Sequence, residues 1–91
     1  MYYILFYKTA DNYIEKRKSF RELHLAYATK ALERGELILA GALADPADGA
    51  ILVFKGESPK AAEDFAKNDP YVLNGVIVEW NVRLWNVAIG G

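Results

Sequence analysis

The sequence of 91 residues contains no cysteine and only one histidine. The absence of cysteine excludes disulfide bonds and thiolate metal sites. One histidine falls short of the roughly three or four nitrogen and sulfur ligands of a protein-built zinc site, so we expect no metal. A chain of this length forms a single domain, here residues 1–91, with a thin stability margin. A second subunit is the expected source of additional burial.

The chain also lacks an excess of positive or negative charge, because its net charge is −1. Nucleic-acid-binding domains usually carry a basic excess and a basic face. The densest basic stretch, Lys16 to Lys18 with Arg21, is typical of a solvated helix surface. The N-terminal segment lacks the pattern of a signal peptide, and no apolar run approaches the roughly 20 residues that span a bilayer. These absences predict a cytoplasmic protein that binds neither nucleic acid nor membranes.

Strand-like and helix-like segments alternate along the chain. Strands are predicted at residues 2–8, 36–43, 50–55 and 76–87, helices at 14–34 and 58–68, and a loop at 71–75. Gly35 stands where the first helix should end, and Ser58 should cap the second helix, which Asp69 and Pro70 end. The order βαββαβ is that of a ferredoxin-like α+β sandwich, in which two helices cover one face of a four-stranded antiparallel sheet.

The first strand is apolar on both sides, since Tyr2, Ile4 and Phe6 alternate with Tyr3, Leu5 and Tyr7. A sheet with one face in water should instead alternate apolar and polar residues. We therefore expect the helices to cover one face and the same face of a second copy to cover the other, which gives a two-fold homodimer.

The single histidine is predicted to lie on the inward side of the first helix. At about 100° per residue, His24 falls within an apolar arc, and Arg17 and Arg21 lie close to the same line. The arc consists of Phe20, Leu23, Tyr27, Ala28, Ala31 and Leu32. Two interpretations fit this position: a core histidine satisfied by a backbone carbonyl, or a titrating group in a functional site.

Asp69 continues the apolar stripe of the second helix, formed by Ala62, Phe65 and Ala66. It is placed at a helix C-terminus, where the macrodipole disfavours an anion, although it also suits a turn with Pro70. Because the two helices should lie side by side, we hypothesise that His24 and Asp69 meet. The carboxylate would then fix the imidazole tautomer, and the free ring nitrogen would act as general base or acid.

Further polar side chains fall near this pair. Arg21 or Arg17 would hold an anionic substrate group by bidentate hydrogen bonds. Tyr3, Tyr7 and Tyr71 would either supply hydroxyl donors to a pocket wall or pack as ordinary half-buried aromatics.

The chain resembles the YciI-like (YCII-related) family. The matching segments are Arg21-Glu22-Leu23-His24-Leu25, Gly35 and the Gly41 region, Ser58 to Glu63 leading to Asn68-Asp69-Pro70-Tyr71, and Asn74-Gly75-Val76 before a strand bearing Trp80. The resemblance implies a dimeric α+β barrel similar to muconolactone isomerases, with His24 and Asp69 in the active site and Gly41 near the substrate. Tyr71 departs from the pattern, which often has phenylalanine after Asp-Pro.

These observations favour a small enzyme without a cofactor, since no P-loop, dinucleotide glycine fingerprint or nucleophile elbow is present. It would transfer a proton on a small acidic metabolite, as an isomerase, lyase or dehalogenase. The alternatives are a non-catalytic protein that binds such a metabolite and a module that only dimerises. An enzyme predicts a polar cavity beside His24, whereas a dimerisation module predicts a filled core.

Overall fold

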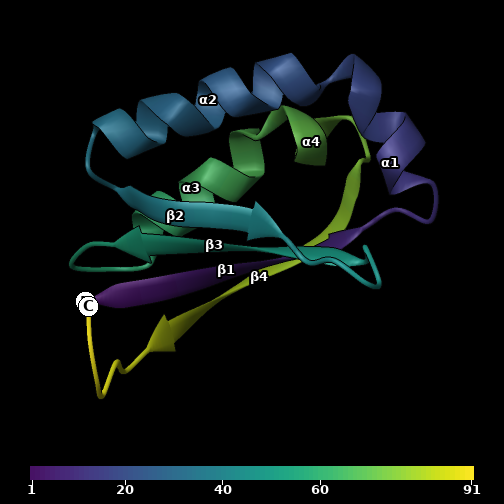
Figure 1. The fold of residues 1–91 in the computed structure, drawn as a ribbon. Coiled ribbons are helices and arrows are strands. Elements are labelled where there is room, and N and C mark those ends of the chain that lie inside the picture. Colours follow the sequence, from purple (N-terminus) through teal and green to yellow (C-terminus); the bar gives the residue numbers. More distant parts are fainter.

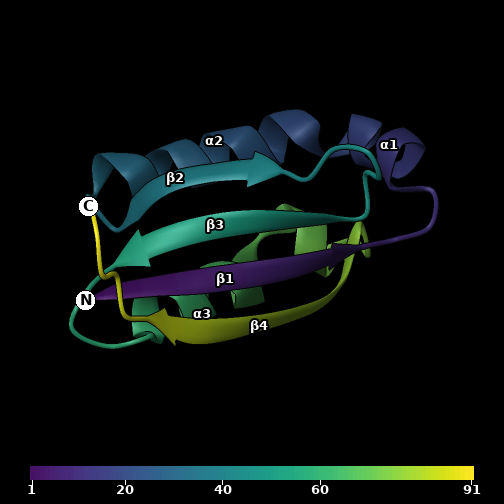
Figure 2. The same ribbon diagram turned by 60° about the horizontal axis from the view of Figure 1, so that its bottom comes forward.

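The computed structural model describes all residues, 1–91, and contains one four-stranded antiparallel sheet (Figures 1 and 2). The strands are β1 (Tyr2–Thr9), β2 (Leu37–Ala42), β3 (Gly49–Lys55) and β4 (Ile77–Trp85), in the spatial order β2-β3-β1-β4. The strand β1 is central, because it pairs with β3 on one side and with β4 on the other. This is the predicted ferredoxin-like α+β arrangement.

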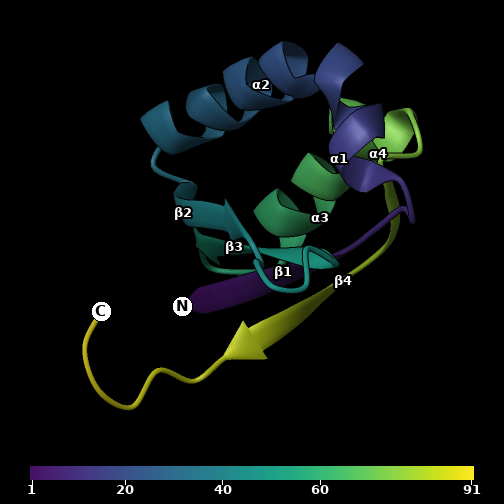
Figure 3. The ribbon, with the colours of Figure 1, turned by 45° about the vertical axis from the view of Figure 1, so that its right-hand side comes forward.

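The helices lie together on one side of this sheet (Figure 3). The two longer ones are α2 (Arg21–Glu33) and α3 (Lys60–Asn68), and the short ones are α1 (Tyr13–Lys16), the 3₁₀ turn η1 (Arg17–Ser19) and α4 (Pro70–Leu73). None of the helices has the length and apolar character needed to cross a membrane.

The predicted first helix, residues 14–34, is interrupted. Phe20 leaves the helical region, with φ −121° and ψ −1°, and separates η1 from α2. Nothing in the composition of residues 16–19 marks this break, because lysine and arginine are good helix formers. The prediction of one continuous helix is therefore wrong, and a turn beside the break carries Arg17.

The predicted loop at residues 71–75 was also wrong, since α4 occupies Pro70–Leu73. Proline suits the first position of a helix, and Asp69 caps this helix by accepting a hydrogen bond from the Tyr71 N–H at 2.9 Å. Beyond the other end of α4, Gly75 has a φ of 71°, which favours glycine.

The last strand ends at Trp85 rather than at residue 87, and its alternation is broken once. Thr9 pairs with Ile77 while Lys8 pairs with Glu79, so Val78 is an extra residue in a β-bulge. As a result, Ile77 is buried and Val78 is exposed. Strict alternation along the predicted strand, residues 76–87, would instead put Val78 and Trp80 on one face and Ile77 on the other, and the bulge shows that this expectation is wrong.

The core lies between the helices and the inner face of the sheet. The inner face carries Tyr3, Leu5 and Tyr7 from β1, and α3 packs Ala62, Phe65 and Ala66 against it. From α2, Tyr27, Ala28 and Ala31 face the core, whereas Leu23 is 61% exposed and Leu32 52%. Since Leu23 lies about 100° from His24 around the helix, the inward arc is narrower than predicted.

The opposite side of the sheet, called the open face here, carries no helix. By register it contains Tyr2, Ile4, Phe6, Leu39, Ile51 and Val53, with Lys8, Lys55, Glu79, Asn81, Arg83 and Trp85 around them. Its centre is apolar, as the sequence indicated.

Candidate functional site

Asp69 lies between two helices, after the last residue of α3 and before the first of α4. Its backbone is extended, with φ −66° and ψ 126°, which is the conformation that a following proline favours. The sequence placed Asp69 at a helix C-terminus or at the start of a turn with Pro70, and the structure makes it the cap of α4 as well. The carboxylate therefore has a backbone donor, Tyr71 N–H, built into the local fold.

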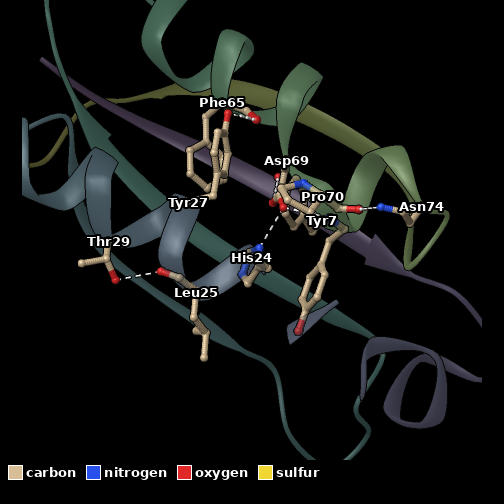
Figure 4. Close-up of polar contacts among 10 residues, drawn as sticks. Tyr7, His24, Leu25, Tyr27, Thr29, Phe65, Asp69, Pro70 and Asn74 are labelled. Atoms are coloured by element: carbon tan, nitrogen blue, oxygen red, sulfur yellow. Dashed lines mark hydrogen bonds and ion pairs between the residues drawn. The ribbon is translucent and has the colours of Figure 1, made fainter. Parts of the chain in front are cut away.

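The structure brings Asp69 and His24 into contact (Figure 4). The Nδ1 atom of His24 lies 2.8 Å from Oδ1 of Asp69, and the Tyr7 hydroxyl donates to Oδ2 at 2.7 Å. Asp69 is 0% exposed, so its charge is shielded from water. Three donors from β1, α2 and α4 thus converge on one buried carboxylate, which is how proteins usually stabilise such a group.

The contact with Asp69 favours one tautomer of neutral His24. An ionised carboxylate only accepts hydrogen bonds, so Nδ1 carries the hydrogen and Nε2 is left as an acceptor. The His24 ring makes no other hydrogen bond within the chain, and its side chain is 16% exposed. Its ring also stacks on that of Tyr71, with centroids 3.9 Å apart and planes 4° from parallel. The ring is held firmly while one nitrogen remains free.

A cavity of about 260 Å³ adjoins His24, between α2 and strands β2 and β3. Its walls are formed by Tyr7, Tyr13, Arg17, Arg21, His24, Leu25, Ala28, Ala40, Gly41, Ala42, Ala50, Leu52, Tyr71 and Ile77. The helix and the strands face each other here through small side chains, mainly alanine, and this leaves the space open. His24, Arg17, Arg21, Tyr71 and Gly41 were all expected at one site, and all of them line this cavity.

The polar end of the cavity is cationic. Arg17 donates to the Tyr13 hydroxyl at 2.7 Å, and its guanidinium carbon lies 5.0 Å from the centre of that ring. Arg21 makes no ion pair with any carboxylate of the chain, and neither does Arg17. Two positive charges without an acidic partner therefore stand at one wall, which suits an anionic ligand.

The hydroxyl of Tyr71 is the one buried side-chain polar atom without a hydrogen-bond partner. Tyr71 is only 5% exposed. Burial raises the pKa of Tyr71, and the nearby Arg21 and Arg17 guanidinium groups oppose that rise. Since buried hydroxyls are normally paired, this atom is a candidate donor to a ligand oxygen.

Tyr7 is the site residue whose role sequence reasoning missed. Burial, and then the neighbouring Asp69 carboxylate, raise the pKa of Tyr7 well above its ordinary value. The inward position of Tyr7 on β1 was visible in the alternation, but its partner was not. Tyr3 was an equal candidate for a hydroxyl donor at the pocket wall, but it makes no side-chain hydrogen bond and does not line the cavity. Tyr27 instead ties α2 to α3, because its hydroxyl donates to the Phe65 carbonyl at 2.8 Å.

No group of three or more histidine, cysteine or acidic residues is arranged to hold a metal ion. The chain thus presents a ferredoxin-like α+β domain with a histidine bound to a buried carboxylate, a small cavity and two guanidinium groups that have no acidic partner. These features define a class of small α+β domains that carry a His–Asp pair beside a cavity.

The chain belongs to the family of the YCII-related domain, whose model matches residues 1–86. A protein of Haemophilus influenzae is 35% identical over 92 residues, which cover 91% of this chain and 94% of the relative. The protein YciI of Escherichia coli O6:H1 is 32% identical over the same shares of the two chains. The predicted resemblance to this family is confirmed.

The same fold is found among solved structures. The 5-chloro-2-hydroxyhydroquinone dehydrochlorinase of Burkholderia phenoliruptrix, in complex with 2,5-dihydroxybenzoquinone, matches with a TM-score of 0.80 and 20% identity. The match covers 97% of this chain and 96% of the other. At this identity the likeness establishes the α+β fold alone.

Proposed function

We propose that this protein is an enzyme without a cofactor that transfers a proton on a small acidic, conjugated compound. The observation that carries the proposal is the state of His24. Its Nδ1 is bound to the buried Asp69, while its Nε2 makes no hydrogen bond within the chain and the residue lines a cavity. A general base needs this combination of a fixed ring and a free nitrogen.

In the proposed reaction, Nε2 takes a proton from the bound substrate, and Asp69 stabilises the imidazolium that forms. The electron pair left on the substrate moves onto a conjugated oxygen. Arg21 and the Tyr71 hydroxyl are available to bind the negative charge there, because Arg21 forms no ion pair with a carboxylate of the chain and the Tyr71 hydroxyl is buried without a hydrogen-bond partner. Return of the proton to a different atom gives an isomerase, whereas departure of a halide with its electron pair gives a dehalogenase.

The shape and composition of the cavity support a small ring compound as the substrate. A volume of about 260 Å³ with mainly apolar walls accommodates one ring, and the two guanidinium groups favour an acidic one. The similar structure is described as a dehydrochlorinase of a chlorinated hydroxyhydroquinone. Acidic hydroxyquinols and unsaturated lactones are therefore the compounds to test first.

The test is a panel of such compounds incubated with the protein in deuterated water. Proton NMR measures the replacement of hydrogen by deuterium at carbon, and ion chromatography measures released chloride for 5-chloro-2-hydroxyhydroquinone. We expect turnover of at least one compound. His24→Gln should reduce it by about 10²- to 10⁴-fold, the usual contribution of general acid–base catalysis.

Glu33→Gln is the matched control for Asp69→Asn, because Glu33 is an exposed acid on α2 that does not line the cavity. We expect Asp69→Asn to lower turnover and Glu33→Gln to leave it unchanged. Turnover that survives His24→Gln would refute the proposed role of the dyad. Ligands that stabilise the protein but never exchange or lose a group would identify a binding protein instead.

A further inference from the structure

We propose that Tyr7 is a positioning residue, whose hydroxyl holds the Asp69 carboxylate in the orientation that presents Oδ1 to His24. The inference rests on the proposed function, since Tyr7 acts through the dyad, and it assigns a role to a residue outside that dyad. Its basis is the buried 2.7 Å hydrogen bond from the Tyr7 hydroxyl to Oδ2.

The carboxylate needs such a contact to be held in one plane. Both His24 and the Tyr71 N–H bind Oδ1, so these two contacts fix only one oxygen. The last torsion of an aspartate is broad and roughly two-fold, which leaves the second oxygen free to swing. Tyr7 is the only residue that donates to Oδ2, and no second donor would replace it.

Tyr7 is also anchored better than either member of the dyad. It lies on the central strand, where it pairs with Ala50 of β3 and Trp80 of β4, and it is 5% exposed. His24 and Asp69 are held by helices that share only one further side-chain hydrogen bond, from the Tyr27 hydroxyl to the Phe65 carbonyl. The Tyr7 hydroxyl therefore fixes the dyad relative to the sheet, which forms the opposite wall of the cavity.

The other groups around Asp69 do not duplicate this role. His24 and Tyr27 face it from α2 and Tyr71 from α4, while Arg17 and Arg21 stand farther along the cavity wall. Tyr27 donates to a backbone carbonyl, and the Tyr71 hydroxyl has no partner. A change confined to the Tyr7 hydroxyl thus acts on the second carboxylate oxygen alone.

The experiment measures the tautomer of His24 by nitrogen-15 NMR at a pH where the ring is neutral. His24 is the only histidine, so its two nitrogen signals are unambiguous. In the wild type we expect the hydrogen to reside on Nδ1. In Tyr7→Phe we expect the ratio of Nδ1–H to Nε2–H tautomers to fall about threefold or more, because a misaligned charge-assisted bond weakens.

Tyr3→Phe is the matched control, since Tyr3 is a buried tyrosine on the same face of β1 without a side-chain hydrogen bond. It should leave the His24 signals unchanged. An unchanged ratio in Tyr7→Phe would overturn the inference, and so would a rise, which would mean that Tyr7 only shares the charge of Asp69.

Asp69→Asn separates the inference from the proposed function. If it changes the His24 signals while Tyr7→Phe does not, the dyad stands and the role of Tyr7 falls. If neither substitution changes them, the dyad itself is refuted. Should Tyr7→Phe fail to fold, the wild-type Tyr7 hydroxyl proton provides the check: it should exchange slowly enough with water to give a resolved resonance, and its absence would refute the bond.

Discussion

Replacement of Tyr71 by phenylalanine should make the ligand-free protein more stable. The Tyr71 hydroxyl is buried without a hydrogen-bond partner, and leaving such a group unpaired costs about 1–3 kcal/mol. Tyr71→Phe removes that cost and keeps the ring, which stacks on His24 at 3.9 Å. We therefore expect the free energy of unfolding to increase by about 1 kcal/mol, the lower end of that range.

Tyr27→Phe is the matched comparison, because the Tyr27 hydroxyl has a partner, the Phe65 carbonyl at 2.8 Å. Its loss leaves a carbonyl unpaired and should lower the free energy of unfolding by about 1 kcal/mol. For a domain of this size, 1 kcal/mol corresponds to a change of about 4–8 °C in Tm. The two substitutions remove the same atom and should shift Tm in opposite directions.

Urea unfolding at pH 7, followed by the fluorescence of the two tryptophans, measures both changes. Equal destabilisation by the two substitutions would refute the reasoning, since it would show that the Tyr71 hydroxyl is bonded in solution. A ligand that accepts a hydrogen bond from this hydroxyl should favour the wild type, which it should stabilise more than it stabilises Tyr71→Phe.

Three further predictions concern other parts of the molecule. Because the pKa of Tyr7 is raised on folding, the unfolded chain releases this proton first, and stability should fall by up to about 1.4 kcal/mol per pH unit above about pH 10. Tyr7→Phe should make that fall shallower in urea titrations at pH 10 to 11.5. We propose that a second copy of the chain covers the open face. Sedimentation should then give the mass of two chains for the wild type and of one chain for Phe6→Lys. A monomeric wild type at micromolar concentration would refute this proposal. Gly35→Ala should cost about 1 kcal/mol, because Gly35 has a φ of 79°, whereas Gly41→Ala, with open space around the new atom, should change stability by less than about 0.5 kcal/mol.

The order of elements could be predicted from the sequence because turn-forming residues separate the apolar segments. Gly35 ends α2, and the Ser58 hydroxyl accepts a hydrogen bond from the Lys60 N–H at the start of α3, as predicted. The break at Phe20 could not be predicted, because the lysine and arginine residues before it are good helix formers. The Arg17–Tyr13 contact beside it leaves no pattern in the helix propensities.

The contact between His24 and Asp69 was predicted because each residue continues an inward stripe on its helix. Periodicity places side chains on faces, and two helices on one sheet face must lie close together. The third member of the cluster was not predicted, because β1 offers three inward aromatic or aliphatic side chains and alternation does not rank them. Which tyrosine meets the carboxylate depends on the register of β1 against α3 and on the length of the side chain.

The separation of the site residues along the chain links the site to the completion of folding. His24 and Asp69 are 45 residues apart, and Tyr7 and Asp69 are 62 apart. Each half of the chain supplies one strand–helix–strand unit, and the carboxylate gains its two side-chain partners, His24 and Tyr7, only when the two halves dock. Neither half on its own can hold the three groups together. A partly folded chain therefore lacks the site, and the NMR signal of the single imidazole reports on the folding of the whole domain.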